Sequence, residues 1–306
     1  HLNPDGSTGA RNGVRLIGLN HKMGNRATVN TALNLGEEEP CVGELVGEPG
    51  KGLAAMFHMM NEARLGVGVF ACGLGMAGYL YSVEYARTRL QGRPLIAKDA
   101  KQPQIPIIQH PDVRRMLLQQ RAWIEGSLAL CLTCARLVDE AACTEDSITR
   151  ATLNSLLDLL TLIAKAYPSD VCTRANDLAI QILGGYGYSR EYPVERLWRD
   201  NRLNAIHEGT NGIQGIDLLG RKILKDQGRT LGLLIERILT TITTGLTDPR
   251  CAPLASQLSK TLDQTRLATT SLITLASSNL ACAMSHSSAY LEMLGITVVG
   301  WMWLQQ

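Results

Sequence analysis

The sequence lacks an excess of charge of either sign. Its 306 residues include 30 lysines and arginines and 28 aspartates and glutamates, which leaves a net charge of +2. Proteins that bind nucleic acid or an anionic membrane surface by electrostatic attraction need a basic excess or a basic patch. The charge balance therefore predicts no nucleic-acid partner and no electrostatic attachment to a membrane.

The cysteines lack the regular spacing of a disulfide framework. Scattered thiols in a chain of this length are typical of a protein that is kept reduced, so a cytoplasmic location is expected. Cys131 and Cys134 form a C-x-x-C pair, but no second pair and no nearby histidine accompanies them, so no metal site is predicted. The eight cysteines are at positions 41, 72, 131, 134, 143, 172, 251 and 282.

The first residues lack the features of a secretion signal. His1 is not a methionine, and the segment 1–9 (HLNPDGSTG) is rich in turn residues instead of apolar ones. We therefore expect the chain to begin within a longer protein.

Helical patterns dominate the sequence after residue 50. Apolar periodicity, strong helix formers and capping residues predict four long helices, which favours an up-and-down bundle. Three further helices are expected after residue 228. The aromatic segment 300–304 at their end is predicted to be exposed and to need a partner surface. The predicted helices are 53–90, 112–143, 147–167, 169–183, 231–245, 254–280 and 281–304.

The first predicted helix contains nineteen consecutive uncharged residues, Leu65 to Val83. By length alone such a run can cross a bilayer. Its five glycines suit close packing between helices, so a buried helix of a bundle is the favoured interpretation, and membrane insertion is ranked last. The glycines are at positions 66, 68, 73, 75 and 78.

Residues 1–50 have a different pattern. Short strand-like runs at 14–17, 28–35 and 41–46 alternate with turn residues. The run 47–52 (GEPGKG) lacks the spacer and the Lys-Ser/Thr end of a phosphate-binding P-loop. This part is therefore predicted to be a small β-structure, followed by a loop that leads into the first helix.

The stretch 178–214 is the candidate site. Residues 181–187 include three glycines in four positions, which either end a helix or form a loop that lets a phosphate approach closely. Thr210 is predicted to cap the helix that follows it. Glu208 is either a general base on a flexible loop or a charge that stabilises the start of that helix.

Three motifs follow one another in this stretch. They are Q-x-L-G-G-x-G from residue 181, E-Y-P-V-E-R-L-x-R-D from residue 191 and H-E-G-T-N-x-I-Q from residue 207. In this order and spacing they resemble the C-terminal signature of the acyl-CoA dehydrogenase family. The resemblance implies a mainly α fold with three parts, which are the end of a β-domain (1–50), the family's C-terminal helical bundle (51–228) and extra C-terminal helices (229–306).

The resemblance also implies roles for individual residues. Glu208 would remove the α-proton of an acyl-CoA thioester, with Arg64 and Gly209 beside the substrate. Because that proton is only weakly acidic, a carboxylate base needs a dry and ordered site. Flavin adenine dinucleotide (FAD), partly that of a neighbouring subunit, would be bound by Arg89, Gln181, Gly184, Gly185 and Thr210.

The function that the resemblance implies is FAD-dependent dehydrogenation of an acyl-CoA to a trans-2-enoyl-CoA. An electron-transfer flavoprotein as electron acceptor and a homo-oligomeric assembly are implied with it. The C-terminal extension and the run 107–117 (IIQHPDVRRML) resemble members that act on 3-methylthiopropanoyl-CoA, which is the narrower alternative. A different alternative is a non-catalytic helical module that oligomerises or binds a partner.

Overall fold

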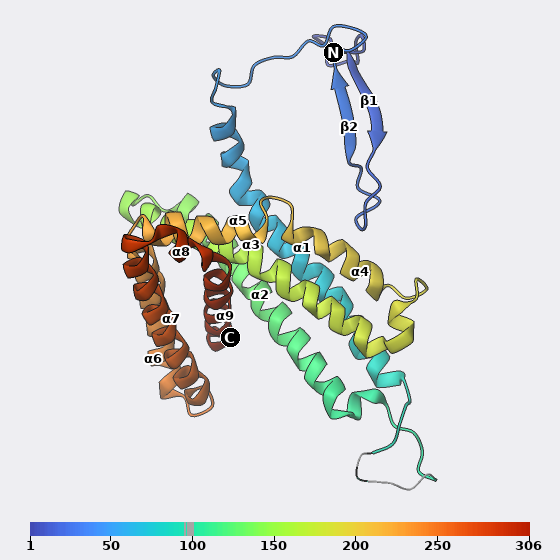
Figure 1. The fold of residues 1–306 in the computed structure, drawn as a ribbon, viewed down its shortest axis with the longest axis vertical. Coiled ribbons are helices and arrows are strands. Elements are labelled where there is room, and N and C mark those ends of the chain that lie inside the picture. The colour runs from blue at the N-terminus through green and yellow to red at the C-terminus, as the bar shows by residue number, and fades with distance from the viewer. Residues whose placement is uncertain (95, 97–100) are drawn as a thin grey trace. The chain divides into compact units, whose positions relative to one another are not determined.

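The computed structural model describes residues 1–94, 96 and 101–306, and by its internal contacts the chain divides into two units, His1–Met60 and Asn61–Gln306. The fold is mainly α with a small antiparallel sheet near the N-terminus, as the sequence predicted (Figure 1). The strands are β1 (Val14–Leu19) and β2 (Thr31–Leu35). The α-helices are α1 (Gly52–Thr88), α2 (Pro111–Cys143), α3 (Ser147–Leu183), α4 (Val194–Asn201), α5 (Asn211–Ile216), α6 (Arg229–Thr247), α7 (Ala252–Ser278), α8 (Leu280–Ser285) and α9 (Ser287–Gln305). Shorter 3₁₀ and π segments are η1 (Ile107–Gln109), η2 (Gly184–Tyr188), η3 (Arg202–Ala205) and η4 (Asp217–Leu224).

The two strands form an antiparallel hairpin with an irregularity between Leu16 and Gly18. The third predicted strand, 41–46, is wrong, because the structure has no strand there. The amide side chain of Asn12 donates to Val42 O at 2.7 Å and accepts from Val42 N at 2.9 Å. These bonds occupy the backbone groups through which Val42 would join a sheet, so a side chain takes the place of a strand partner.

Glycines allow α1 to lie very close to α3. A Cβ added at Gly68 would lie 2.1 Å from Ala164 O, and one added at Gly78 would lie 2.7 Å from the side-chain oxygen of Asn176. The predicted packing role is confirmed at these positions and at Gly75, where an added Cβ would also meet α3. Of the five glycines in the uncharged run 65–83, Gly66 and Gly73 have open space around them.

The third and fourth predicted long helices are one helix, α3, which continues through Pro168. The prediction of a break there was wrong. Proline has no N–H to donate to Ala164 O, but the thiol of Cys131 lies 3.8 Å from that oxygen. In the next turn the hydroxyl of Ser169 donates to Lys165 O at 2.5 Å. Neighbouring side chains thus satisfy part of what proline removes, and the bundle has three long helices instead of four.

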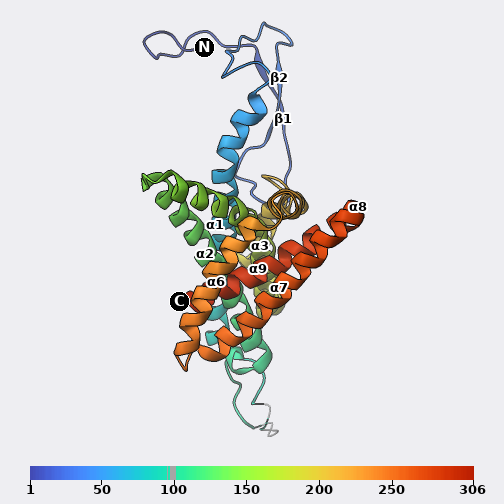
Figure 2. The ribbon, with the colours of Figure 1, turned by 90° about the vertical axis from the view of Figure 1, so that its left-hand side faces the viewer.

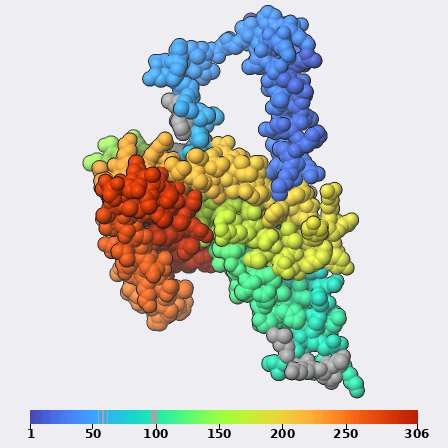
Figure 3. Space-filling model, in the orientation of Figure 1, coloured from blue at the N-terminus to red at the C-terminus, as the bar shows by residue number. Residues whose placement is uncertain are grey.

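The C-terminal helices pack onto α2 and α3. The helices α6 and α7 form a hairpin, and α9 contacts α2, α3, α5 and α7 (Figures 1 and 2). In the space-filling view these orange and red helices make a continuous surface with the neighbouring yellow and green ones (Figure 3). The last predicted helix, 281–304, is interrupted at His286, which separates α8 from α9.

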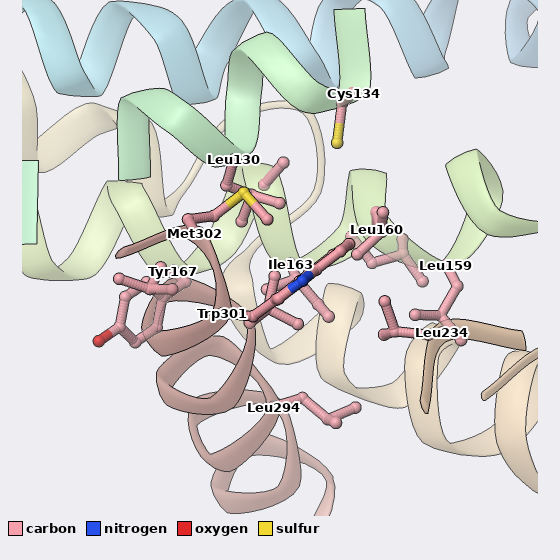
Figure 4. Close-up of a cluster of buried hydrophobic side chains, with 14 of the residues drawn as sticks. Leu130, Cys134, Leu159, Leu160, Ile163, Tyr167, Leu234, Leu294, Trp301 and Met302 are labelled. Carbon is pink, nitrogen blue, oxygen red and sulfur yellow. The ribbon is translucent and has the colours of Figure 1, made fainter. Parts of the chain in front are cut away.

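The C-terminal aromatic segment is partly buried within the chain, since Trp301 and Met302 are buried whereas Trp303 and Leu304 are half-buried. Trp301 is only 3% exposed and lies among Leu160, Ile163 and Leu234, from α3 and α6 (Figure 4). Its indole N–H donates to the hydroxyl of Thr241 at 2.8 Å. The prediction that this segment is exposed was therefore wrong for Trp301 and Met302. The partner surface of these two residues is the core of the same chain.

Candidate active site

The predicted flavin-binding residues near the end of α3 line one cavity. Its volume is about 790 Å³, and it lies where the end of α1 and the loop after it meet the end of α3 and η2. The structure thus brings together side chains that are about ninety residues apart in the sequence. The predicted residues in its wall are Arg89, Gln181, Gly184 and Gly185.

Glycine is required for a different structural reason at each of two positions near this cavity, Gly184 and Gly187. Gly184 has a positive φ of 61°, which favours glycine, and it ends α3. A Cβ added at Gly187 would lie 2.3 Å from Ile180 O, so that glycine allows the chain to fold back on the helix. Gly185 has neither reason, since an added Cβ there would meet nothing within 4 Å. Its backbone faces open space, which is the arrangement that a ligand needs to approach closely.

Aromatic side chains surround the cation of this cavity. The guanidinium carbon of Arg89 lies 5.3 Å from the ring centre of Tyr186, within the range of a cation–π contact. The Tyr186 ring also meets Tyr85 edge-on at 6.5 Å and stacks on Tyr192 at 5.0 Å. Sequence reasoning missed the tyrosines and also His110, which lines the same cavity. The available signal was Tyr186 itself, because a large ring between two glycines has no role in ending a helix.

The second group of predicted residues forms a strained turn before α5. Glu208 has a φ of 53° and Gly209 a φ of 84°, so two consecutive residues adopt the left-handed conformation. Such a conformation is costly for a residue that is not glycine and is concentrated at functional sites. A Cβ at Gly209 would lie 2.6 Å from the side-chain nitrogen of Gln214. The prediction that Thr210 caps the next helix is confirmed, because its hydroxyl accepts from Ile213 N at 3.3 Å.

Two buried side chains hold the carbonyl groups of this turn. The Lys165 ammonium donates to Gly209 O at 2.7 Å and to the side-chain oxygen of Asn211 at 3.2 Å. The Gln214 amide donates to Glu208 O at 3.1 Å and to Gly209 O at 3.2 Å. Lys165 has no exposed surface. Sequence reasoning missed it, although it is the only charged residue in the apolar run 159–169 (LLTLIAKAYPS).

Burial and nearby charges shift the pKa values of Lys165 and His207. Burial, with a smaller contribution from the positive charge of Arg64, lowers the pKa of Lys165 to about 8, while the charge of Glu208 opposes the shift. Burial also lowers the pKa of His207, and the charge of Lys165 acts in the same direction. The imidazole therefore favours its neutral form. Its Nε2 lies 3.1 Å from the side-chain oxygen of Asn204.

Arg64, predicted to lie beside the substrate, is only 7% exposed. Its guanidinium lies 3.8 Å from the carboxylate of Asp217, which also pairs with Arg221 at 3.6 Å. Within the described residues its Nε has no hydrogen-bond partner. Arg64 therefore joins the charged surroundings of Lys165, and its charged partner belongs to η4 and not to the Glu208 turn.

The two groups of site residues lie at different places along α3. Lys165, which holds the Glu208 turn, precedes Gln181 by sixteen residues. At 1.5 Å per residue this separates them by about 24 Å along the helix axis. The cavity wall includes neither Glu208 nor Thr210. The predicted site residues thus fall into two separate groups, which are candidate half-sites and do not share a single pocket.

Other candidate features carry no site chemistry. A hydrogen bond with Cys72, together with burial, raises the pKa of Cys131, and burial raises the pKa of Cys134, so these thiols are not activated. All eight cysteines are free. Among the described residues no cluster of three or more potential metal-binding side chains is present. The segment Glu62–Thr88 of α1 is long and apolar enough to cross a membrane by length and composition. This is weak evidence, because core helices meet the same criterion, and its residues Ala71 and Cys72 belong to the main core.

Family models match two parts of the chain. The model "Acyl-CoA dehydrogenase, C-terminal domain" matches residues 96–224, and "Acetyl-CoA dehydrogenase C-terminal like" matches residues 234–306. The chain belongs to the acyl-CoA dehydrogenase family. This confirms the resemblance drawn from the three sequence motifs, and the second match covers most of the C-terminal extension, 229–306.

Individual relatives of this chain agree with that assignment. The 3-methylmercaptopropionyl-CoA dehydrogenase of Ruegeria pomeroyi is 39% identical over 77% of this chain and 39% of the relative. A broad-specificity linear acyl-CoA dehydrogenase of Mycobacterium tuberculosis is 32% identical over 98% of this chain and 51% of the relative. The chain therefore spans about half of these relatives or less. Among solved structures, an acyl-CoA dehydrogenase complexed with FAD from Bacillus anthracis has the same fold, with a TM-score of 0.71 and 22% identity over 94% of this chain and 49% of that one.

Proposed function

We propose that the protein catalyses FAD-dependent dehydrogenation of an acyl-CoA to a trans-2-enoyl-CoA, with Glu208 as the base. The observation that carries this proposal is the left-handed Glu208–Gly209 turn, whose carbonyl groups are held by Lys165 and Gln214. A charge that only stabilises a helix start needs no strained backbone. A general base must be held where the proton will be, and strain that the surroundings maintain serves that need.

The cavity at the end of α3 fits the pyrophosphate of FAD. Arg89 supplies a cation at its wall, and Gly184 and Gly185 leave open space beside the backbone. Gln181 adds an amide that can donate to a phosphate oxygen. When bound, FAD supplies the acceptor for the hydride that leaves the β-carbon.

The residues around Glu208 would act on the other half of the reaction. The Glu208 carboxylate takes the α-proton onto one of its oxygens, which makes the α-carbon electron-rich. Within the described part of the chain no ion pair or hydrogen bond engages that carboxylate, so it is available to accept a proton. The buried charge of Lys165 lies near enough to interact with it electrostatically. Arg64 and Gly209 are proposed to lie beside the thioester, and Thr210 beside the flavin.

The separation of the two half-sites supports a homo-oligomer. A distance of about 24 Å along α3 lies between the cavity group and the base group, so we propose that each FAD contacts the cavity of one chain and the base of another. The residues Val69, Phe70, Leu80 and Tyr81 of α1 are 37–58% exposed, and this apolar surface supports burial in such an assembly. The alternative of a purely structural oligomerisation module does not explain the strained Glu208 turn.

The remaining partners follow from the reaction class. We propose an electron-transfer flavoprotein as the acceptor of the electrons from reduced FAD. The 39% identity to the Ruegeria pomeroyi enzyme supports 3-methylthiopropanoyl-CoA as a candidate substrate, beside straight-chain acyl-CoAs. The free thiols support a reducing compartment such as the cytoplasm.

The test is an anaerobic flavin-bleaching experiment on the full protein that carries this chain. Purified protein is saturated with FAD and desalted, and its absorbance is recorded before and after butyryl-CoA, octanoyl-CoA or 3-methylthiopropanoyl-CoA is added. We expect the wild type to bleach and Glu208→Gln to retain FAD without bleaching. Gly185→Asp should retain less FAD, because a carboxylate beside the pyrophosphate repels it. Bleaching of Glu208→Gln at the wild-type rate would refute its role as the base.

A further inference from the structure

The Lys165 ammonium is buried in the interior of the chain. Lysine is strongly hydrated in water, and burial of its charge is costly unless hydrogen bonds and charges compensate it. Lys165 has no exposed surface, and its bonds go to Gly209 O at 2.7 Å and to the Asn211 side chain at 3.2 Å. These acceptors lie one and three residues after Glu208. The buried cation is therefore directed at the turn that carries the base.

The bonds to this turn hold the backbone that follows Glu208. Lys165 and Gln214 both donate to the carbonyl oxygen of Gly209, and Gln214 also donates to the carbonyl oxygen of Glu208. A peptide plane that is held by its oxygen has little freedom to rotate. With the planes on both sides of Gly209 held, the left-handed conformation of Gly209 is maintained, and the backbone that directly follows the Cα of Glu208 is held in place.

The attachment of α5 to α3 does not by itself require Lys165. The amide of Asn211 donates to Ala166 O at 3.2 Å, which already ties the start of α5 to α3. Lys165 differs because its shorter bond goes to the carbonyl beside Glu208. Its lowered pKa, about 8, agrees with a group that is held in a dry interior and not at a solvated helix end.

We propose that Lys165 is a positioning residue for the base: through Gly209 O it holds the Glu208–Gly209 turn in its left-handed form and so aims the Glu208 carboxylate. The inference rests on the proposed function. Lys165 acts through the turn and does not exchange a proton with the substrate. Displacement of a catalytic group by about 1 Å can lower a rate by about 100-fold, which sets the size of the effect to expect.

Two substitutions of Lys165 test the inference in the full protein with FAD bound. Lys165→Met keeps the apolar stem but removes the donor, whereas Lys165→Gln retains an N–H donor without the charge. With butyryl-CoA as the probe, or whichever tested acyl-CoA bleaches the wild type fastest, Lys165→Met should lower kcat by about 100-fold with KM and FAD content within about twofold of wild type. Lys165→Gln should recover about tenfold of that loss.

A matched control separates positioning from general packing. Gln120 is buried on α2 and donates to Ala175 O of α3 at 2.7 Å, so Gln120→Met also removes one buried bond to the same helix. It should lower the melting temperature by a similar amount and leave kcat within about twofold of wild type, because Gln120 does not contact the Glu208 turn. A kcat of Lys165→Met within twofold of wild type, or an equal loss in Gln120→Met, would overturn the inference.

Hydrogen exchange tests the turn without turnover. The amides of Ile213 and Gln214, which donate to Thr210 Oγ1 and Thr210 O at the end of this turn, should exchange at least tenfold faster in Lys165→Met than in wild type or in Gln120→Met. Unchanged exchange would refute the claim that Lys165 holds the turn, whatever the activities are. If the wild type binds FAD but none of the tested acyl-CoAs bleaches it, the proposed function is refuted. The exchange result would then decide by itself whether Lys165 holds the turn.

Discussion

Substitution of Lys165 should change how the stability of the fold depends on pH. The pKa of this buried ammonium falls from 10.5 to about 8 in the folded chain. Between those values the unfolded chain holds a proton on the lysine that the folded chain has released. Stability rises with pH wherever the unfolded state binds more protons, so Lys165 makes a contribution that increases as pH rises from 8 to 10.5. Lys165→Met removes that contribution.

The magnitude follows from the size of the shift. A pKa difference of 2.5 units, from 10.5 to about 8, corresponds to about 3 kcal/mol at 1.36 kcal/mol per unit. Roughly 2 kcal/mol of this change is expected between pH 7 and pH 9.5. The cysteines and tyrosines also titrate at high pH. They are the same in both proteins and cancel when the two free energies of unfolding are subtracted.

The measurement is equilibrium unfolding in urea of wild type and Lys165→Met at several pH values from 7 to 9.5, followed by tryptophan fluorescence. The free energy of unfolding of wild type minus that of Lys165→Met should increase with pH by about 2 kcal/mol over this range. Gln120→Met serves as the control, and its difference from wild type should stay constant. If the difference in the free energy of unfolding between wild type and Lys165→Met stays constant or decreases with pH, the ammonium is protonated at least as readily in the folded chain as in the unfolded chain.

Three further substitutions test other parts of the fold. Trp301→Ala should lower stability by about 3–5 kcal/mol, seen as a lower urea midpoint, because it removes a buried indole and its bond to Thr241. Gly187→Ala should destabilise the protein by about 1–3 kcal/mol and reduce FAD retention, since its Cβ would lie 2.3 Å from Ile180 O; a melting temperature equal to that of wild type would contradict this. Thr210→Ala should cost about 1 kcal/mol of stability through loss of the helix cap, whereas Thr210→Ser should restore most of it.

The elements with local causes were predicted well from the sequence. The apolar periodicity of residues 53–90 and 112–143 identified α1 and α2 to within a few residues. Thr210 was predicted as a cap because a hydroxyl before a helix satisfies free N–H groups of the next turn. The residues Gln181, Gly184 and Gly185 were predicted to bind FAD from the resemblance to the family signature, and the structure places all three at one cavity.

Predictions failed where a distant residue decided the local structure. Residues 41–46 have a strand-like sequence, but Asn12, some thirty positions earlier, occupies the backbone groups of Val42. Pro168 normally ends a helix, yet α3 continues because neighbouring side chains engage the carbonyls around it. The apolar character of Trp301 was evident, but the α3 and α6 surface that covers it was not.

The sequence by itself determined the family, the helical class and the identities of the candidate base and cofactor residues, because these depend on residue types at short, ordered spacings. Only the tertiary structure decided that Arg89 joins Gln181 at one cavity, while the Glu208 turn is held by Lys165 at a different part of α3. It alone also showed that Lys165 is buried with its charge directed at the Glu208 turn. Burial, strain and shared hydrogen bonds arise from residues that are far apart in the chain, and their distances are set when the helices pack.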